Sequence, residues 1–252
     1  MCGRYASSRA PADLAGRFEA SWDGRETLAA SWNVAPTDPV WAVMERPDRD
    51  TGAIERSLRA VRWGLVPSWA KDPAVGSRMI NARVETVHEK PAYRRAFAKR
   101  RCLLPADGFY EWQPVPATAG AKAYKQPYFI RPEDGAVMAM AGLYEFWRDP
   151  SVPDEDDPAA WLTTATIITT EATDHAGRIH PRMPLALEAA DYEAWLDPGH
   201  QDTHALRALL HTPANGDLQV RAVTTAVNSV RNNGPHLLDA PAGPVPAPPD
   251  AF

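Results

Sequence analysis

Proline occupies 25 of the 252 positions of this chain, roughly twice the usual share of about 5%. Because proline fixes φ and has no N–H group, it interrupts helices and central strands and favours short elements joined by rigid turns. Between these breaks lie runs rich in Val, Ile, Thr and aromatic residues, which predict strands. The predicted strands are Val40–Glu45, Ile54–Leu65, Leu103–Trp112, Tyr128–Arg131, Val137–Trp147, Leu162–Thr170 and Gln219–Val227.

Helical patterns are fewer, and they are found at Pro11–Ala20, Pro91–Arg100, Glu188–Leu196 and Thr203–His211. Runs of strands with occasional helices predict an α+β fold with mostly antiparallel β-sheets or an open barrel and a few peripheral helices. We expect a single domain over residues 1–240 and a disordered tail over residues 241–252, which hold five prolines. Two further stretches, Pro114–Gln126 and Asp149–Pro158, have the composition of insertions or linkers.

Composition excludes several classes of protein. About 44% of the residues are apolar, enough for a core without disulfides, and only two cysteines occur, which suits a reducing cytoplasm. The sequence contains neither a run of 18 apolar residues nor an apolar segment near its start, so we expect no membrane partner. Cys-x-x-Cys pairs are absent and the seven histidines are scattered, so no metal and no cofactor is expected. Nothing in the sequence points beyond a monomer.

Cys2 has the most distinctive chemistry in the chain. Methionine before a small residue is normally removed, which would leave Cys2 with a thiol and a free α-amine. Because that amine has a reference pKa of about 8, a useful fraction is neutral at pH 7. It can form a Schiff base with an aldehyde, and the thiol can then close a five-membered thiazolidine. The alternative is an ordinary core cysteine, the reading that suits Cys102 in its apolar run.

Charge is unevenly distributed along the chain. The net charge is −5, yet the segment from Arg78 to Arg101 holds eight basic and two acidic residues, a local charge of +6. A basic stripe of this kind can follow the phosphates of a nucleic acid. It can equally be the solvated face of a short helix, and the sequence leaves both readings open.

Several motifs occur together in one order along the chain. They are MCGRYA (Met1–Ala6), NVAPT (Asn33–Thr37), RWGLVPSWA (Arg62–Ala70), INARVET (Ile80–Thr86), PADGFYEW (Pro105–Trp112), HPRMP (His180–Pro184) and AVNSVRNNG (Ala226–Gly234). In these motifs the chain resembles the SOS-response-associated peptidase (SRAP) family from residue 2 to about residue 238. The resemblance implies one α+β domain whose processed N-terminal cysteine forms a thiazolidine with the ring-opened sugar of an abasic site. Single-stranded DNA bearing abasic sites is therefore the expected partner.

The resemblance also implies roles for individual residues. Cys2 would be the nucleophile, Asn81 would orient the N-terminus and the sugar, and Glu111 would move protons during imine formation. His180 would act as acid or base in ring opening and in reversal. The DNA-binding residues would be Arg4, Arg83 and Arg182 on the backbone and Trp69 near a strand–duplex junction.

The residues themselves support part of this assignment. Glu111 lies between Tyr110 and Trp112 in an apolar run, where desolvation would raise its pKa, although a structural ion pair is the alternative. Asn81 and Arg83 are two residues apart and would share one face of an extended strand, unless Asn81 only caps the strand and Arg83 only forms a cross-strand ion pair.

His180 and Trp69 both lie in stretches that are predicted to be loops. His180 has a reference pKa near neutrality, but loop histidines are often only polar surface. An exposed Trp69 would stack on an unpaired base.

Two other functions remain open at this level. Cys2, His180 and Glu111 could serve a thiol peptidase, in which self-cleavage would remove Met1. Alternatively, the protein could bind single-stranded DNA without reacting with it. A lyase activity, in which cross-linking leads to strand cleavage, is compatible with covalent capture of the abasic site through Cys2. A free α-amine is needed for thiazolidine chemistry but not for a thiol peptidase, so the amine separates these functions.

Overall fold

The computed structural model describes residues 2–48, 51–117, 122–172, 174–177, 179–210 and 218–245. The strands in this part of the chain are β1 (Tyr5–Ser7), β2 (Ser31–Val34), β3 (Pro39–Pro47), β4 (Ile54–Trp63), β5 (Asn81–Arg83), β6 (Arg101–Ala106), β7 (Gly108–Val115), β8 (Tyr124–Pro132), β9 (Met138–Arg148), β10 (Trp161–Glu171), β11 (Arg182–Pro184) and β12 (Leu218–Ala222). The α-helices are α1 (Pro11–Arg17), α2 (Arg94–Lys99), α3 (Asp174–Gly177), α4 (Tyr192–Leu196) and α5 (Thr203–Ala208). Short 3-10 helices lie at Pro73–Arg78, Pro158–Ala160, Ala189–Asp191, Thr225–Asn228 and Pro235–Leu238.

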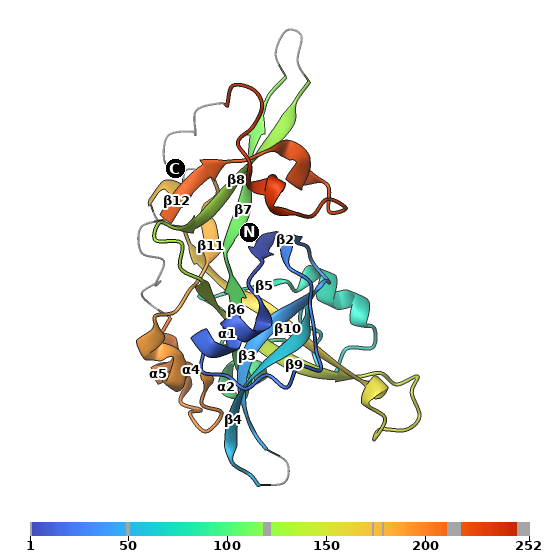
Figure 1. The fold of residues 1–252 in the computed structure, drawn as a ribbon. Helices are drawn as coiled ribbons and strands as arrows, with labels where there is room; N and C mark the ends of the chain where they lie inside the picture. The colour runs from blue at the N-terminus through green and yellow to red at the C-terminus, as the bar shows by residue number, and fades with distance from the viewer. Residues whose placement is uncertain are drawn as a thin grey trace.

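The strands form two sheets that share a core (Figure 1). One is an antiparallel sheet with the strand order β12-β8-β7-β1-β2. The other has the order β11-β10-β4-β3-β6-β9, and an additional β9–β10 pairing closes β10, β4, β3, β6 and β9 into a ring. The described part of the chain therefore contains a five-stranded barrel next to an antiparallel sheet.

Side chains alternate between two apolar clusters on the barrel strands, as the period of a β-strand requires. On β3, Val40, Ala42 and Met44 belong to the cluster shared with the antiparallel sheet. Trp41 and Val43 belong to the second cluster, which α1, α2, α4 and α5 cover. In Figure 1, α4 and α5 lie to the left of the barrel, and β7, β8 and β12 rise above it. The site described below lies on the side of the first cluster.

The expected fold class is confirmed, and most predicted strands are found within a few residues of their predicted ends. The predicted strand Leu103–Trp112 is wrong in one respect, because it is two strands that belong to different sheets. The chain changes sheet at Asp107, whose N–H donates to the Ala6 carbonyl and whose carboxylate accepts the Ser8 N–H at 2.6 Å. One residue therefore joins the barrel to the antiparallel sheet.

Gln219–Val227 is only partly a strand, because β12 ends at Ala222 and the Thr224 hydroxyl caps a 3-10 turn by accepting the Ala226 N–H. Pro114–Gln126 is not simply an insertion, since both of its ends belong to the hairpin of β7 and β8. Most of the predicted disordered tail, residues 246–252, lies outside the described residues.

None of the described helices, the longest of which has seven residues, could cross a lipid bilayer. The short strand β5 confirms the extended segment expected at Asn81 and Arg83, whereas β1, β2 and β11, of three or four residues each, were not predicted. Such short segments carry too little periodicity to be recognised from the sequence.

Gly142 is a packing constraint of the barrel and generates a test of the fold. A Cβ at this position would meet the Leu104 side chain, the Thr166 carbonyl oxygen at 2.9 Å and the Cys102 sulfur at 3.1 Å. We expect Gly142→Ala to reduce the free energy of unfolding by about 1–3 kcal/mol, because overpacking a closed core strains it. Chemical denaturation measures the effect. Gly16→Ala, in α1 with no atom within 4 Å of the added Cβ, is the control. Equal losses in both variants would contradict the prediction.

Candidate active site

Cys2 is fully buried three residues before β1, within the core that the two sheets share. β1 is held between β2 and β7, so Tyr5 lies opposite Val34 on one side and Phe109 on the other. Burial raises the pKa of the Cys2 thiol well above its usual value, and the nearby Glu111 carboxylate raises it further. The thiol is therefore protonated at neutral pH, and its electrostatic coupling to Glu111 places these two groups in one site.

Asn81 makes the direct contact between the barrel and the N-terminal segment. Its Nδ2 donates a 2.7 Å hydrogen bond to the carbonyl oxygen of Cys2, although the two residues are 79 positions apart. Asn81 is placed by β5, which pairs in parallel with β10 so that Asn81 lies opposite Ile167. The other amide atom, Oδ1, is buried and has no hydrogen-bond partner among the described residues. A buried acceptor without a partner is costly, as expected for an atom that receives a ligand.

Glu111 is presented by β7, in register with Tyr128 of β8, and is 5% exposed. Burial raises the pKa of its carboxyl group to about 7. This outcome agrees with the expectation drawn from its apolar neighbours, since desolvation disfavours the charged form. Near neutral pH such a group is present in both protonation states, so it can accept a proton in one step and return it in the next.

His180 lies in the segment between α3 and β11. Ala176 of α3 and Met183 of β11 belong to the same core cluster as Cys2. Partial burial lowers the pKa of the imidazole below its usual value. Its Nδ1 is 3.0 Å from the backbone nitrogen of Arg182 and 3.2 Å from the carbonyl oxygen of that residue. When neutral at Nδ1 it can accept the Arg182 N–H, and when protonated there it can donate to the Arg182 carbonyl. Both protonation states therefore have a partner.

The predicted DNA-binding arginines differ in their surroundings. Arg4 donates to the Asn33 Oδ1 at 2.7 Å and to the Val227 carbonyl at 3.1 Å, and its guanidinium lies 5.7 Å from the centre of the Trp112 ring. Arg83 is exposed on β5, two residues from Asn81. Arg4 directly precedes β1 of the antiparallel sheet, and Arg83 lies on β5, which pairs with the barrel strand β10.

Arg182 is largely enclosed, with a side chain that is 14% exposed. Its guanidinium donates to both carboxylate oxygens of Glu85, at 2.5 and 3.1 Å, and to the Thr169 carbonyl at 2.6 Å. The same residue holds His180 through its backbone. Arg182 therefore connects an acidic side chain, strand β10 and the candidate acid–base histidine.

Trp69 is 67% exposed, in the segment between β4 and the turn at Pro73–Arg78. The indole N–H of Trp147 donates to the carbonyl oxygen of the next residue, Ala70, at 2.7 Å, which anchors this segment on β9. The structure thus brings Cys2, Asn81 and Glu111 together, packs the His180 segment against the same core, and leaves Trp69 as an open aromatic surface.

Two residues that the sequence argument did not single out help to build the site. Asn33 is buried, accepts from Arg4, and donates to the carbonyls of Ser229 and Asn232, so it ties β2 to the loop of the AVNSVRNNG motif. Glu85 holds Arg182. Both lie within the motifs quoted above, but only their three-dimensional partners reveal their roles.

Fold and site together define a class of protein. A model of the SOS response associated peptidase (SRAP) family matches residues 1–230, so the chain belongs to the SRAP family.

Relatives in this family have been named for the DNA lesion on which they act. The chain is 38% identical to the abasic site processing protein YoaM of Bacillus subtilis over 95% of its own length and 98% of that protein. It is 32% identical to the abasic site processing protein HMCES of Xenopus tropicalis, over 95% of this chain and 78% of that one. A crystal structure of a Bacteroides thetaiotaomicron protein has the same fold, with a TM-score of 0.73 at 23% identity, over 95% of this chain and 99% of that one.

The pKa of Glu111 generates a test of the site. Its folded-state pKa of about 7 exceeds the reference value of 4.5. The carboxyl therefore contributes stability that is complete below pH 4.5 and is lost as pH rises through about 7. The difference corresponds to at most about 3 kcal/mol. The wild type loses this contribution as pH rises, whereas Glu111→Gln has no carboxyl group to ionise. We therefore expect the free energy of unfolding of Glu111→Gln to increase relative to that of the wild type between pH 5 and pH 8, as measured by denaturant unfolding. Parallel stability curves for the two proteins would contradict the raised pKa.

Proposed function

We propose that this protein captures abasic sites in single-stranded DNA covalently, through a thiazolidine formed with Cys2 after Met1 has been removed. The observation that carries the proposal is the 2.7 Å hydrogen bond from Asn81 to the Cys2 carbonyl, beside a buried Glu111 whose pKa is about 7. This arrangement holds the backbone of the N-terminal residue and supplies a proton-exchanging group. The abasic site processing proteins among its relatives support the choice of substrate.

The first step is imine formation. The neutral α-amine of Cys2 attacks C1′ of the ring-opened sugar, which is an aldehyde, and gives a carbinolamine. A proton leaves the nitrogen and the hydroxyl group departs as water, so one group must first accept and then donate a proton. Glu111 suits both tasks because its pKa lies near the working pH. Water is the only product released, and no redox change occurs.

The second step is ring closure. The Cys2 sulfur adds to the imine carbon while the thiol proton passes to the imine nitrogen, which completes the thiazolidine. Burial keeps this thiol protonated until the imine is present. A cysteine hydrolase needs the reverse, a thiol whose pKa is lowered so that the thiolate is ready. The raised pKa of the Cys2 thiol therefore favours amine-led chemistry over a thiol peptidase.

His180 and Asn81 have supporting roles in this proposal. The imidazole stays largely neutral at pH 7 and keeps a partner at Nδ1 in either protonation state, which suits proton transfer to the sugar oxygen in ring opening and in reversal. Asn81 holds the Cys2 carbonyl with Nδ2, and its buried Oδ1 remains to accept a sugar hydroxyl or the N-terminal amine. The two residues would thus position the reacting atoms.

Single-stranded DNA is the proposed substrate because a duplex encloses the abasic nucleotide between stacked base pairs, and extruding it costs a few kcal/mol. Arg4, Arg83 and Arg182 would contact the phosphates, and the exposed Trp69 would stack on a neighbouring base. Arg83 is the most accessible of the arginines, whereas Arg4 and Arg182 already bind acceptors within the protein.

The N-terminus provides the decisive experiment. The proposed chemistry needs an amine and a thiol on the same residue, so an extra residue before Cys2 should abolish the heat-stable adduct with an abasic oligonucleotide, while binding persists. Processed Cys2→Ser should form an imine that borohydride traps, but no lasting adduct without reductant, because a hydroxyl closes the ring less favourably. Denaturing gels with and without borohydride measure both. Cys102→Ser, at the other buried cysteine, is the matched control.

The alternatives predict different patterns in the same gels. A thiol peptidase would tolerate the N-terminal extension and give no amine-dependent trapping. A passive single-strand binder would give no trapping in any variant. A heat-stable band from the blocked protein would refute the thiazolidine and require another nucleophile.

Salt dependence tests the proposed phosphate contacts. Each arginine that neutralises a phosphate contributes about one unit to the slope of log K against log salt. We expect Arg83→Gln to reduce this slope by about one unit, and Arg4→Gln and Arg182→Gln to reduce it as well once DNA displaces their internal partners. Fluorescence anisotropy with single-stranded DNA measures the slope. A variant with an unchanged slope would remove that arginine from the interface.

A further inference from the structure

Glu85 lies between cations that the proposed function needs for DNA. It lies two residues after the end of β5, and both of its carboxylate oxygens accept from the guanidinium of Arg182. The hydrogen bond from Arg182 lowers the pKa of Glu85, and the positive charge of Arg83 lowers it further. One carboxylate therefore occupies the face of Arg182 that a phosphate would use and also acts electrostatically on Arg83.

The two partners differ in exposure and in what else holds them. The side chain of Glu85 is 46% exposed, whereas that of Arg182 is 14% exposed. Arg182 also donates to the Thr169 carbonyl at 2.6 Å, and its backbone is paired in β11 with Glu171 of β10. Arg182 would therefore keep its place if the carboxylate left, while Glu85 can move into solvent.

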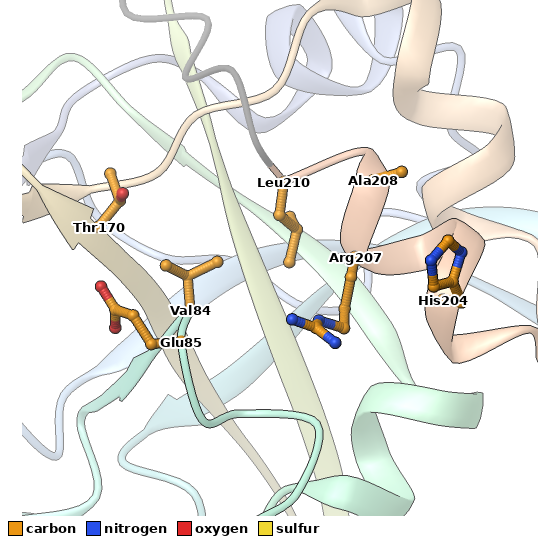
Figure 2. A pocket seen from close by; sticks show the side chains of 7 residues that line it. All are labelled: Val84, Glu85, Thr170, His204, Arg207, Ala208 and Leu210. Carbon is orange, nitrogen blue, oxygen red and sulfur yellow. The ribbon is translucent and has the colours of Figure 1, made fainter.

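A groove beside Glu85 gives the carboxylate somewhere to move. This groove, of about 420 Å³, is lined by Glu85, Val84 and Thr170 on one side and by His204, Arg207, Ala208 and Leu210 on the other. Figure 2 shows the guanidinium of Arg207 on the opposite side of Val84 from Glu85, directed toward the strand side of the groove. Arg207 has no ion pair among the described residues. A carboxylate released from Arg182 would thus enter a groove that already holds a cation.

We infer that Glu85 is an exchangeable counter-ion of Arg182, which a phosphodiester of the bound DNA strand displaces. In the free protein the carboxylate occupies the position of the phosphate and keeps the guanidinium in its binding orientation. Because the carboxylate must be displaced, it lowers the affinity for any DNA phosphate, damaged or not. Glu85 is therefore a specificity-determining residue: it weakens binding to undamaged strands, while the covalent step retains the abasic ones. This inference rests on the proposed function.

The test is the affinity for an undamaged single-stranded oligonucleotide, measured by fluorescence anisotropy on the full chain. We expect Glu85→Gln to bind roughly two- to fivefold more tightly than the wild type, the range that a partly exposed ion pair spans. The gain should be clearly smaller in an Arg182→Gln background, because the competition is for that guanidinium. Glu85→Asp, which retains the charge, should stay near the wild type. Unchanged or weaker binding by Glu85→Gln would overturn the inference and make Glu85 a simple structural support.

A matched control uses another Glu–Arg pair of the barrel, Glu45 with Arg56 at 2.8 Å between β3 and β4. Glu45→Gln should leave DNA affinity unchanged, and an equal gain there would mean that net charge alone explains the result. Cross-linking to an abasic oligonucleotide is assayed separately. If the wild type binds DNA and forms no adduct while Glu85→Gln still gains affinity, the proposed function fails and only the displacement of Glu85 by a phosphate stands. If adducts form but Glu85→Gln gains no affinity, only the counter-ion role fails.

Discussion

β10 is the strand on which the rest of the structure depends. It pairs with β9 and then β11 along one edge, and with β4 and then β5 along the other. The β9 and β4 pairings close the barrel, and the β5 and β11 pairings bring the residues of the site to the open end of the same strand. Because Asn81 lies opposite Ile167 and Arg83 opposite Thr169, a shift of one residue in this register would turn the side chain of Asn81 away from Cys2.

Burial is the common physical cause of the chemistry at the site. It raises the pKa of the Cys2 thiol and of the Glu111 carboxyl, and it lowers that of the His180 imidazole. All three changes favour the uncharged form, because desolvation penalises whichever form carries charge. A reaction that adds an amine to an aldehyde and releases water needs proton exchange between neutral groups. The core that stabilises the fold is thus also the medium in which the proposed reaction proceeds.

Around this core the polar side chains that would face DNA are held by acceptors within the protein. Asn33 receives Arg4 and ties it to the loop containing Ser229 and Asn232, while Glu85 and Thr169 receive Arg182. Arginines fixed in this way have lost part of their conformational freedom before DNA arrives, which reduces the entropic cost of binding. In the proposed complex their internal partners would be exchanged for phosphates, which would reduce affinity in favour of a defined geometry.

The sequence by itself determined the class of fold, the strands with clear alternation such as β3 and β9, the 1,2-aminothiol potential of Cys2 and the raised pKa of Glu111. Each of these depends on local composition or on neighbours along the chain. Family motifs pointed to Asn81 and His180, but not to the contacts that hold them. Only the tertiary structure decided that Leu103–Trp112 divides between two sheets at Asp107. It also decided that Asn81 donates a hydrogen bond to the Cys2 carbonyl and that the Glu85 carboxylate pairs with the Arg182 guanidinium. These are pairings between residues far apart in the chain, set by strand register and by the closure of the barrel, and no local pattern encodes which distant partner a polar side chain will meet.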